Sequence, residues 1–315
     1  MQIISGRISR PQKVVIYGPE GIGKTTLGAA FPGALLLDVE QGSGHLDCDR
    51  INVEAWAEFC ETLEALYSDR ENLNYKTIVI DSADWLEKLA TVFICSENDV
   101  RGIEDFGYGK GYVYLTEEII RALALLDQLR NAGLNIVLIG HSTVVKRELP
   151  GSQGAFDRYE LKCSKRVTAL FKEWADAVLF LNYKIIVEEG ADGKTRARGG
   201  HDRLLMTEHT AAFDAKNRWG LESEVKVGPA EDPLPVDIKK HLAGLEPKQQ
   251  KKGTEKKKEK TELEKALEGA ELTREDLKLF LDKQGINKLT KKVEAQIIEN
   301  IEKVSESIAH IKGLE

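Results

Sequence analysis

A glycine-rich segment near the N-terminus holds the residues whose types and spacing most clearly support chemistry. It fits the pattern G-x-x-x-x-G-K-[ST] and runs Gly18, Pro19, Glu20, Gly21, Ile22, Gly23, Lys24 and Thr25, followed by Thr26. Such glycines let backbone N–H groups surround an anion, while the lysine reaches the β- and γ-phosphates and the first threonine contacts the metal ion. We therefore expect residues 18–26 to bind a nucleoside triphosphate, with ATP and Mg²⁺ as the cofactors.

Carboxylates follow two apolar segments further along the chain. The run at residues 77–80 ends in Asp81, in the form of a Walker B segment, so Asp81 is expected to hold the metal ion or its water. An aspartate that merely caps a strand is the alternative. The run at residues 35–37 precedes Asp38 and Glu40, either of which can orient and deprotonate an attacking water. Glu40 is favoured over Asp38 for this role.

The elements that must position these groups alternate between strands and helices. Apolar, strand-like runs occupy residues 14–17, 34–37, 77–80, 136–139 and 177–181, and amphipathic helical patterns occupy residues 55–67, 85–95 and 115–132. This alternation predicts an α/β fold with a mostly parallel sheet buried on both faces and flanked by helices. Residues 184–187 and 203–206 flank a turn-rich stretch at 191–194 and predict a β-hairpin, whose plain alternative role is to extend the sheet.

The composition is that of a chain with a substantial core, because 42% of the 315 residues are apolar. The formal net charge of −7 argues against a general attraction to nucleic acid, so any such binding must come from local basic segments. The four cysteines lack paired metal-ligand spacing, and the sequence shows neither a signal-peptide core nor a membrane-spanning stretch. These features predict a cytoplasmic protein with reduced thiols and no membrane partner.

Composition also divides the chain into three parts. Residues 1–245 hold the α/β pattern, residues 246–261 are rich in lysine with almost no apolar residue, and residues 262–315 return to apolar positions at helical spacing. The middle part is expected to be a flexible, solvated linker, with contact to DNA as the alternative. The last part predicts about three short helices, one beginning at a cap formed by residues 273–276 and one ending at Gly285.

The motifs together resemble those of RecA/RadA-type ATPases. The resemblance is closer to phage-encoded RecA-like nucleotide-binding proteins, whose members include single-strand annealing recombinases. It covers residues 13–221 and rests on residues 18–26, 37–40, 77–82, 105–112, 139–142, 157–161, 172–176 and 215–218. It implies a RecA-like P-loop ATPase core, a homo-oligomer (ring or filament), and a place in the cytoplasm of a phage-infected or prophage-carrying bacterial cell.

The resemblance also implies roles for individual residues. His141, followed by Ser142, would sense the γ-phosphate, with an ordinary polar strand cap as the alternative. Lys216 and Arg218 match a Lys-x-Arg element that enters the ATP site of the neighbouring subunit, where cations neutralise charge on the transferring phosphoryl group. Solvent-facing charges are the alternative for this pair. The expected catalytic residues are Lys24, Glu40, His141, Lys216 and Arg218.

Two further segments combine aromatic and basic residues. Residues 102–114 and 143–166 are expected to be loops at places that correspond to the DNA-binding loops of RecA-like proteins. Aromatic rings there can stack on bases while cations follow the phosphate backbone. The expected single-stranded-DNA-binding residues are Phe106, Tyr108, Lys110, Tyr112, Lys146, Arg147, Arg158, Lys162 and Lys165. An ordinary charged surface is the alternative, and acidic neighbours predict a modest, salt-sensitive affinity.

Two functions follow as hypotheses. The first is a DNA-stimulated ATPase that acts on single-stranded DNA in phage-type recombination, repair or annealing, with annealing favoured over full strand exchange. The second is a DNA-independent ATPase switch or a loader for a replication protein. In both, the C-terminal helices would form an interaction module that binds a single-stranded-DNA-binding protein, DNA or another subunit.

Overall fold

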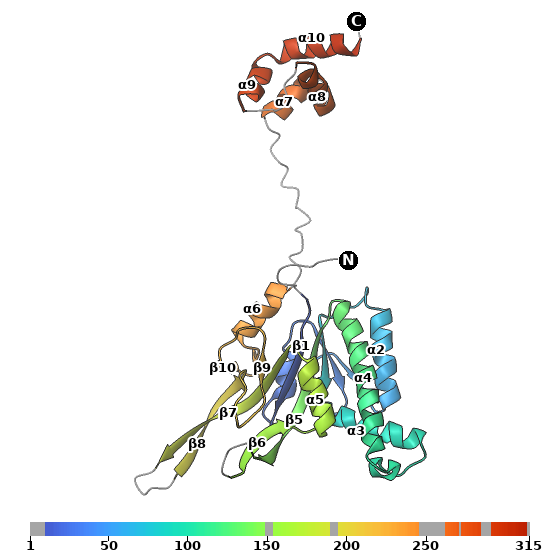
Figure 1. The fold of residues 1–315 in the computed structure, drawn as a ribbon. Coiled ribbons are helices and arrows are strands. Elements are labelled where there is room, and N and C mark those ends of the chain that lie inside the picture. The colour runs from blue at the N-terminus through green and yellow to red at the C-terminus, as the bar shows by residue number, and fades with distance from the viewer. Residues whose placement is uncertain are drawn as a thin grey trace. The chain divides into compact units, whose positions relative to one another are not determined.

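The structure, a computed structural model, describes residues 10–148, 154–189, 195–245, 262–270, 272–284 and 291–313 (Figure 1). Internal contacts divide the chain into two units, Met1–Lys248 and Gln249–Glu315. The expected lysine-rich linker, residues 246–261, lies outside the described residues.

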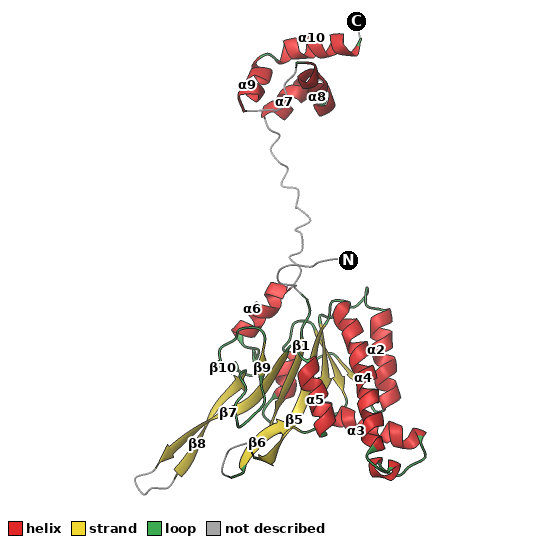
Figure 2. Cartoon of the chain, in the orientation of Figure 1, coloured by secondary structure: helices red, strands yellow, loops and turns green. Residues whose placement is uncertain are grey.

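The first unit alternates strands with helices (Figure 2). Its strands are β1 (Lys13–Gly18), β2 (Ala34–Asp38), β3 (Arg50–Asn52), β4 (Thr77–Asp81), β5 (Asn135–Arg147), β6 (Phe156–Leu161), β7 (Ala177–Glu189), β8 (Thr195–Met206), β9 (Lys216–Asn217) and β10 (Glu224–Lys226). Its helices are α1 (Lys24–Ala29), α2 (Trp56–Ser68), α3 (Ala83–Glu97), α4 (Lys110–Asn131), α5 (Lys165–Trp174) and α6 (Val236–Leu245), with 3₁₀ turns η1 (Ser43–His45) and η2 (Ile103–Phe106).

A mostly parallel sheet forms the centre of this unit. Its strand order is β10-β8-β7-β1-β5-β4-β2-β3, and the six strands from β7 to β3 pair in parallel. Strand β5 therefore lies between the strand that leads into the glycine-rich loop and the strand that ends in Asp81. The expected α/β fold with a parallel sheet is confirmed.

Helices cover both faces of the sheet, because the parallel strands bury side chains on both sides. In β1, Val15 and Tyr17 pack into the apolar cluster beneath α2, α3, α4 and α5. The alternate residues Val14 and Ile16 pack into the opposite cluster, beneath α1 and α6. Two apolar layers thus hold the strand ends, and the loops that follow them, in place.

The two segments expected to be aromatic and basic loops are mostly regular structure. Residues 102–114 contain η2 and the first turns of α4. Within residues 143–166, β5 continues to Arg147 and pairs antiparallel with β6, while residues 149–153 lie outside the described part of the chain. The expectation of irregular loops was wrong there. The β5–β6 hairpin leaves no clear pattern in the sequence. Its residues are mostly half-buried or exposed, so neither face is continuously apolar.

The hairpin expected after residue 181 is present. Strands β7 and β8 pair antiparallel from Phe180 with Met206 to Glu189 with Thr195. The expected turn at residues 191–194 lies outside the described residues.

The second unit contains α7 (Glu262–Gly269), α8 (Arg274–Lys283), α9 (Lys291–Glu299) and α10 (Ile301–Lys312). Its core brings together Leu263, Leu267, Leu277 and Ile297. The expected cap is present, because Thr273 Oγ1 accepts a hydrogen bond from the Asp276 N–H at 3.2 Å. The expected stop at Gly285 falls outside the described residues. Across the described parts of both units, no helix is both long and apolar enough to cross a membrane.

Candidate active site

The register of the parallel strands brings distant parts of the sequence to one edge of the sheet. Gly18 in β1 lies opposite His141 in β5, and Asp81 in β4 lies opposite Asp38 in β2 and Ile139 in β5. Ligands of open α/β sheets bind at this edge, outside the carboxyl ends of the strands. The glycine-rich loop, Asp81, His141 and the residues after β2 therefore share one site.

The glycine-rich loop adopts the backbone that its composition predicts. Gly21 and Gly23 have φ angles of +71° and +94°, in the left-handed region that glycine enters without strain. A Cβ atom at Gly23 would also lie 2.4 Å from an Arg203 nitrogen, so a side chain there would strain the backbone and displace the Arg203 guanidinium. Ile22 is buried in the core and thereby fixes the loop to the core. These features hold the backbone N–H groups of the loop in a fixed curve.

Lys24 is buried and lies across the loop, with Nζ donating a hydrogen bond to the Pro19 carbonyl at 2.8 Å. Burial lowers the pKa of its ammonium, and the carboxylates of Asp81 and Glu40 act in the opposite direction. A cation that is poorly solvated by its surroundings gains most from an anionic partner. This environment suits contact with phosphate oxygens.

Thr25 and Asp81 provide oxygen atoms of the kind that Mg²⁺ prefers. Thr25 Oγ1 donates a hydrogen bond to Asp81 Oδ2 at 2.6 Å. Burial raises the pKa of Asp81, and the hydrogen bond from Thr25 acts against that rise. A buried carboxylate beside a hydroxyl gains charge neutralisation from a hard divalent cation. The two side chains fit a magnesium site, in which they would hold the ion directly or through water.

Glu40 is positioned by the strand that carries Asp81. The N–H groups of Val39 and Glu40 donate to the Asp81 carbonyl at 2.7 and 3.1 Å, which bends the chain after β2 toward β4. The Ser82 hydroxyl donates to Glu40 Oε2 at 3.1 Å. The carboxylate remains about one-third exposed, with a relative side-chain exposure of 32%. It is therefore held at the site and still accessible to water.

Asp38 has a different environment from Glu40. It is buried, and its carboxylate accepts hydrogen bonds from the backbone N–H of Gly42 at 3.3 Å, the backbone N–H of Ser43 at 3.0 Å and the Ser43 hydroxyl. These contacts fold the loop after β2. Because its oxygens are occupied in this way, the geometry favours Glu40 as the group that meets water.

His141 connects Glu40 to α3. Its Nδ1 lies 3.1 Å from each oxygen of the Asp84 carboxylate, and its backbone N–H donates to Asp84 Oδ1 at 3.2 Å. Its Nε2 lies 3.9 Å from Glu40 Oε2. Burial alone would raise the pKa of Asp84, but hydrogen bonds from His141 and Ser82 outweigh it and lower that pKa. An ionised Asp84 orients the imidazole and directs Nε2 toward Glu40.

Residues 10–219 match the AAA domain family, a span that contains every group described so far. The chain belongs to this family of P-loop ATPases. A curated relative, the SPbeta prophage-derived uncharacterized protein YorG of Bacillus subtilis (strain 168), is 26% identical over 181 residues, or 56% of this chain. That match covers 52% of the relative, so the two chains correspond over about half of the relative's length.

Three positioning residues of the AAA domain were not predicted from the sequence. Ser82 follows Asp81 directly and Asp84 comes three residues after it, and polar residues soon after a Walker B strand were the available signal. Arg203 in β8 gave no signal, because nothing in the local sequence indicates that its side chain reaches the glycine-rich loop. Its guanidinium donates to the carbonyls of Ile22 and Gly228, both at 3.2 Å, and so ties the glycine-rich loop to the segment after β10.

The expected finger residues lie at the opposite end of the sheet from the glycine-rich loop of the same chain. Strand β9, which begins at Lys216, pairs with the first residues of β7. Lys216 Nζ donates to three carbonyls at the end of α5, those of Lys172 at 2.9 Å, Glu173 at 3.2 Å and Ala175 at 2.6 Å. Arg218 is exposed and lies 3.5 Å from Asp176. Lys216 thus supports α5 within its own chain, and a role in a neighbouring ATP site stays a prediction.

Some of the expected DNA-binding side chains are engaged within the protein, and others are exposed. Arg158 is of the first kind, which corrects its expected role. This side chain is buried, and its guanidinium donates to the Thr210 and Ala211 carbonyls at 2.9 and 2.7 Å and to Asp214 at 2.6 Å. It organises residues 210–214 and is not available to DNA. Arg147 is also engaged, through two 2.7 Å hydrogen bonds to Glu160.

The aromatic members of the set differ in accessibility. Phe106 packs against the core and meets Tyr114 edge-on at 5.3 Å, and the Tyr112 hydroxyl donates to Glu104 at 2.6 Å. Tyr108 is fully exposed, with a φ angle of +50°. The exposed remainder of the expected set consists of Tyr108, Lys110, Lys146, Lys162 and Lys165.

Proposed function

We propose that this AAA-domain protein binds ATP with Mg²⁺ and hydrolyses it, with Glu40 as the general base. The observation that carries the proposal is the placement of Glu40, whose backbone hydrogen bonds to Asp81 and whose carboxylate accepts from Ser82 at 3.1 Å. A carboxylate directly after the strand that follows the P-loop helix also supports the finer assignment to RecA-like ATPases.

The chain's own residues supply the steps of hydrolysis. Lys24 and the loop N–H groups bind the β- and γ-phosphates, and Thr25 with Asp81 would hold Mg²⁺, which when bound neutralises phosphate charge. Glu40 accepts a proton from water as the water oxygen bonds to the γ-phosphorus. The bond from that phosphorus to the β–γ bridging oxygen breaks, and ADP leaves. His141 keeps the Glu40 carboxylate in place and senses the γ-phosphate.

We place single-stranded DNA as the partner at the same edge of the sheet. The β5–β6 hairpin and the η2–α4 segment both project there (Figure 1), and they carry the exposed residues Tyr108, Lys110 and Lys146. Exposed rings and flexible cations suit base stacking and phosphate contact without sequence preference. Phage-type recombination, repair or annealing in the bacterial cytoplasm is the process we propose, with copies of the chain assembled so that Arg218 reaches a neighbour's ATP site.

One observation favours a second candidate. Arg147 and Arg158 are engaged by acidic and carbonyl groups of their own chain, which reduces the cations available to a phosphate backbone. A DNA-independent ATPase switch or a loader for a replication protein needs no such cations. In that case the helices of residues 262–313 would bind the protein partner, for example a single-stranded-DNA-binding protein.

ATP turnover with and without single-stranded DNA separates the two candidates. The full chain is assayed with Mg²⁺ and ATP, and the Lys24→Ala variant serves as the blank. The first proposal predicts turnover that DNA increases severalfold. Turnover above the blank but indifferent to DNA would favour the protein-directed switch, and turnover equal to the blank would contradict both.

A further inference from the structure

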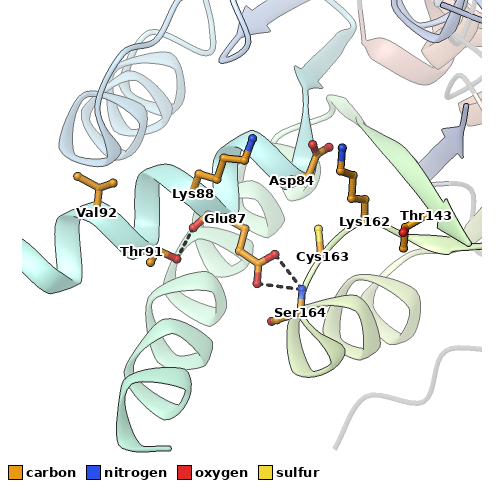
Figure 3. A pocket seen from close by; sticks show the side chains of 9 residues that line it. All are labelled: Asp84, Glu87, Lys88, Thr91, Val92, Thr143, Lys162, Cys163 and Ser164. Atoms are coloured by element: carbon orange, nitrogen blue, oxygen red, sulfur yellow. Dashed lines mark hydrogen bonds between the residues drawn. The ribbon is translucent and has the colours of Figure 1, made fainter. Parts of the chain in front are cut away.

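A groove of about 460 Å³ lies beside the candidate active site, between α3 and the segment that joins β6 to α5 (Figure 3). Helix α3 contributes Asp84, Lys88 and Val92, and the opposite wall contributes Thr143, Lys162 and Ser164. We call this the α3 groove. No motif in the sequence predicted that these residues would form one site.

Two exposed lysines, Lys88 and Lys162, line the α3 groove, and the exposed ring of Trp85 lies next to the first of them. Lys88 Nζ lies 3.8 Å from the centroid of the Trp85 ring, and Trp85 is 38% exposed. Figure 3 shows the amino groups of Lys88 and Lys162 on the same side of the groove, with the Asp84 carboxylate between them. A planar ring flanked by flexible cations is the combination that binds a nucleotide through its base and its phosphate.

The carboxylates of the groove are engaged within the protein. Asp84 is buried and accepts from His141, as described above. Glu87 accepts two hydrogen bonds, at 2.9 and 3.1 Å, from the backbone N–H of Ser164 (Figure 3). Their negative charge is thus partly compensated inside the fold. Lys88 and Lys162 are exposed, so an anion from solvent can reach both and would compete with Glu20 for Lys162.

Two contacts join the α3 groove to the candidate active site. Lys162 Nζ lies 3.3 Å from Oε1 of Glu20, a residue of the glycine-rich loop. Asp84 lines the groove and also holds His141, which faces Glu40. An anion in the groove would therefore contact Lys162, which pairs with the glycine-rich loop. It would also lie next to Asp84, which holds the histidine that faces the general base.

We propose that the α3 groove binds one nucleotide of single-stranded DNA and reports its presence to the ATP site. The phosphodiester contacts the ammonium groups of Lys88 and Lys162 from the solvent side, away from the Asp84 carboxylate that lies between them, and the base packs on Trp85. The phosphodiester competes with Glu20 for Lys162. DNA binding therefore removes the ion pair between Lys162 and the glycine-rich loop. Linkage then requires that bound nucleotide alters DNA affinity by the same factor. The inference rests on the proposed action on DNA and adds a site and a route of regulation.

To test whether single-stranded DNA occupies the α3 groove, the affinity of the full chain for a fluorescent oligo-dT is measured with a non-hydrolysable ATP analogue present. Trp85→Leu is expected to weaken binding about fivefold or more, because stacking on an aromatic ring contributes about 1–3 kcal/mol per base. Lys88→Ala is expected to reduce the slope of log affinity against log salt concentration by about 0.7, the value for one phosphate contact on a single strand. Thermal unfolding of each variant confirms that it is folded.

Lys240→Ala is the matched control for the lysine variants. Lys240 is an exposed lysine of α6 that lies 3.4 Å from Asp237, much as Lys162 lies 3.3 Å from Glu20. This control should leave both the affinity and the salt slope unchanged.

The connection to the ATP site is tested by a double-mutant cycle. The ratio of DNA affinities with the ATP analogue and with ADP is measured for Glu20→Gln, Lys162→Gln and the double variant. Each single variant is expected to change the ratio, and the double variant is expected to change it no further than one alone. Fully additive effects would overturn the proposed route.

The outcomes separate this inference from the proposed function. If the wild-type chain binds DNA while Trp85→Leu and Lys88→Ala behave like Lys240→Ala, the groove is excluded and the proposed action on DNA stands. If the wild-type chain retains no DNA with either nucleotide, both are overturned.

Discussion

Thr25 donates a hydrogen bond to Asp81 across 2.6 Å, which joins the glycine-rich loop directly to the end of β4. Thr25 lies in the first turn of α1, and β5 lies between β1, which leads into the loop, and β4. The loop therefore reaches over β5 to bring its hydroxyl to the carboxylate. This contact defines where the metal ion of the AAA domain would sit.

Asp81→Asn should remove the dependence of ATP binding on Mg²⁺. The amide lacks the charge that a buried site needs to hold a divalent cation. We expect the affinity for a fluorescent ATP analogue to be the same with Mg²⁺ as with EDTA, whereas the wild type binds more tightly with Mg²⁺. Asp127→Asn, at an ion pair of 3.0 Å with Lys13, is the control. A full magnesium effect in Asp81→Asn would place the metal elsewhere.

Arg203→Ala should weaken ATP binding about tenfold, because two hydrogen bonds from a charged donor to the loop and its neighbour are lost. Arg203→Lys should recover only part of the loss, since a single ammonium does not reproduce the planar fork that bridges Ile22 and Gly228. Binding is measured by titration with a fluorescent nucleotide. Lys226→Ala, at an exposed ion pair nearby, should bind normally. An unchanged affinity in Arg203→Ala would show that the loop keeps its shape without this support.

Asp214→Asn should destabilise the first unit at neutral pH and much less in acid. Burial alone would raise the pKa of Asp214, but hydrogen bonds from Lys172 and Arg158 outweigh it and lower that pKa. A carboxyl group with a folded pKa below its unfolded value stabilises the fold above the unfolded pKa, near 4, and loses this effect as pH falls through the folded pKa. We expect a loss of about 3 kcal/mol in unfolding free energy at pH 7.

Urea unfolding followed by tryptophan fluorescence checks this prediction, because all four tryptophans lie in the first unit. The difference between wild type and Asp214→Asn should narrow below about pH 4. Asp202→Asn is the control, since both members of the Asp202–Lys226 pair are more than half exposed. Such a pair contributes little to stability. A difference for Asp214→Asn that is independent of pH would rule out its charge as the cause.

Arg218→Ala should abolish ATP hydrolysis and leave ATP binding nearly unchanged, if Arg218 acts in a neighbour's site. Mixing this variant with Lys24→Ala should restore part of the activity, because some interfaces then pair an intact glycine-rich loop with an intact arginine. Turnover of the mixture is compared with that of each variant alone. No recovery on mixing, or unchanged turnover in Arg218→Ala, would exclude the finger. Lys216→Ala is less informative, since Lys216 also binds three carbonyls at the end of α5.

The sequence predicts five of the six parallel strands and the groups at their ends, because both leave strong local signals, whereas the three-residue β3 is too short to leave one. Apolar runs mark β1, β4 and β5, and the glycine-rich loop and Asp81 follow two of those runs directly. Contacts between distant segments leave no such signal. The tie from Arg203 to Ile22 and the engagement of Arg158 by Asp214 depend on strands that meet only in the folded chain. A basic residue in a sequence is therefore weak evidence for a DNA contact until its partners are known.

The Glu40→Gln variant tests whether Glu40 is the general base of the ATPase site. Glutamine keeps the shape of the side chain and can still accept from Ser82, but it does not accept a proton from water. ATP affinity and turnover are measured on the same preparation. We expect ATP affinity within about threefold of wild type, and turnover lower by a factor on the order of 10²–10⁴, the usual contribution of a positioned base. Turnover within a few-fold of wild type, with binding intact, would contradict it.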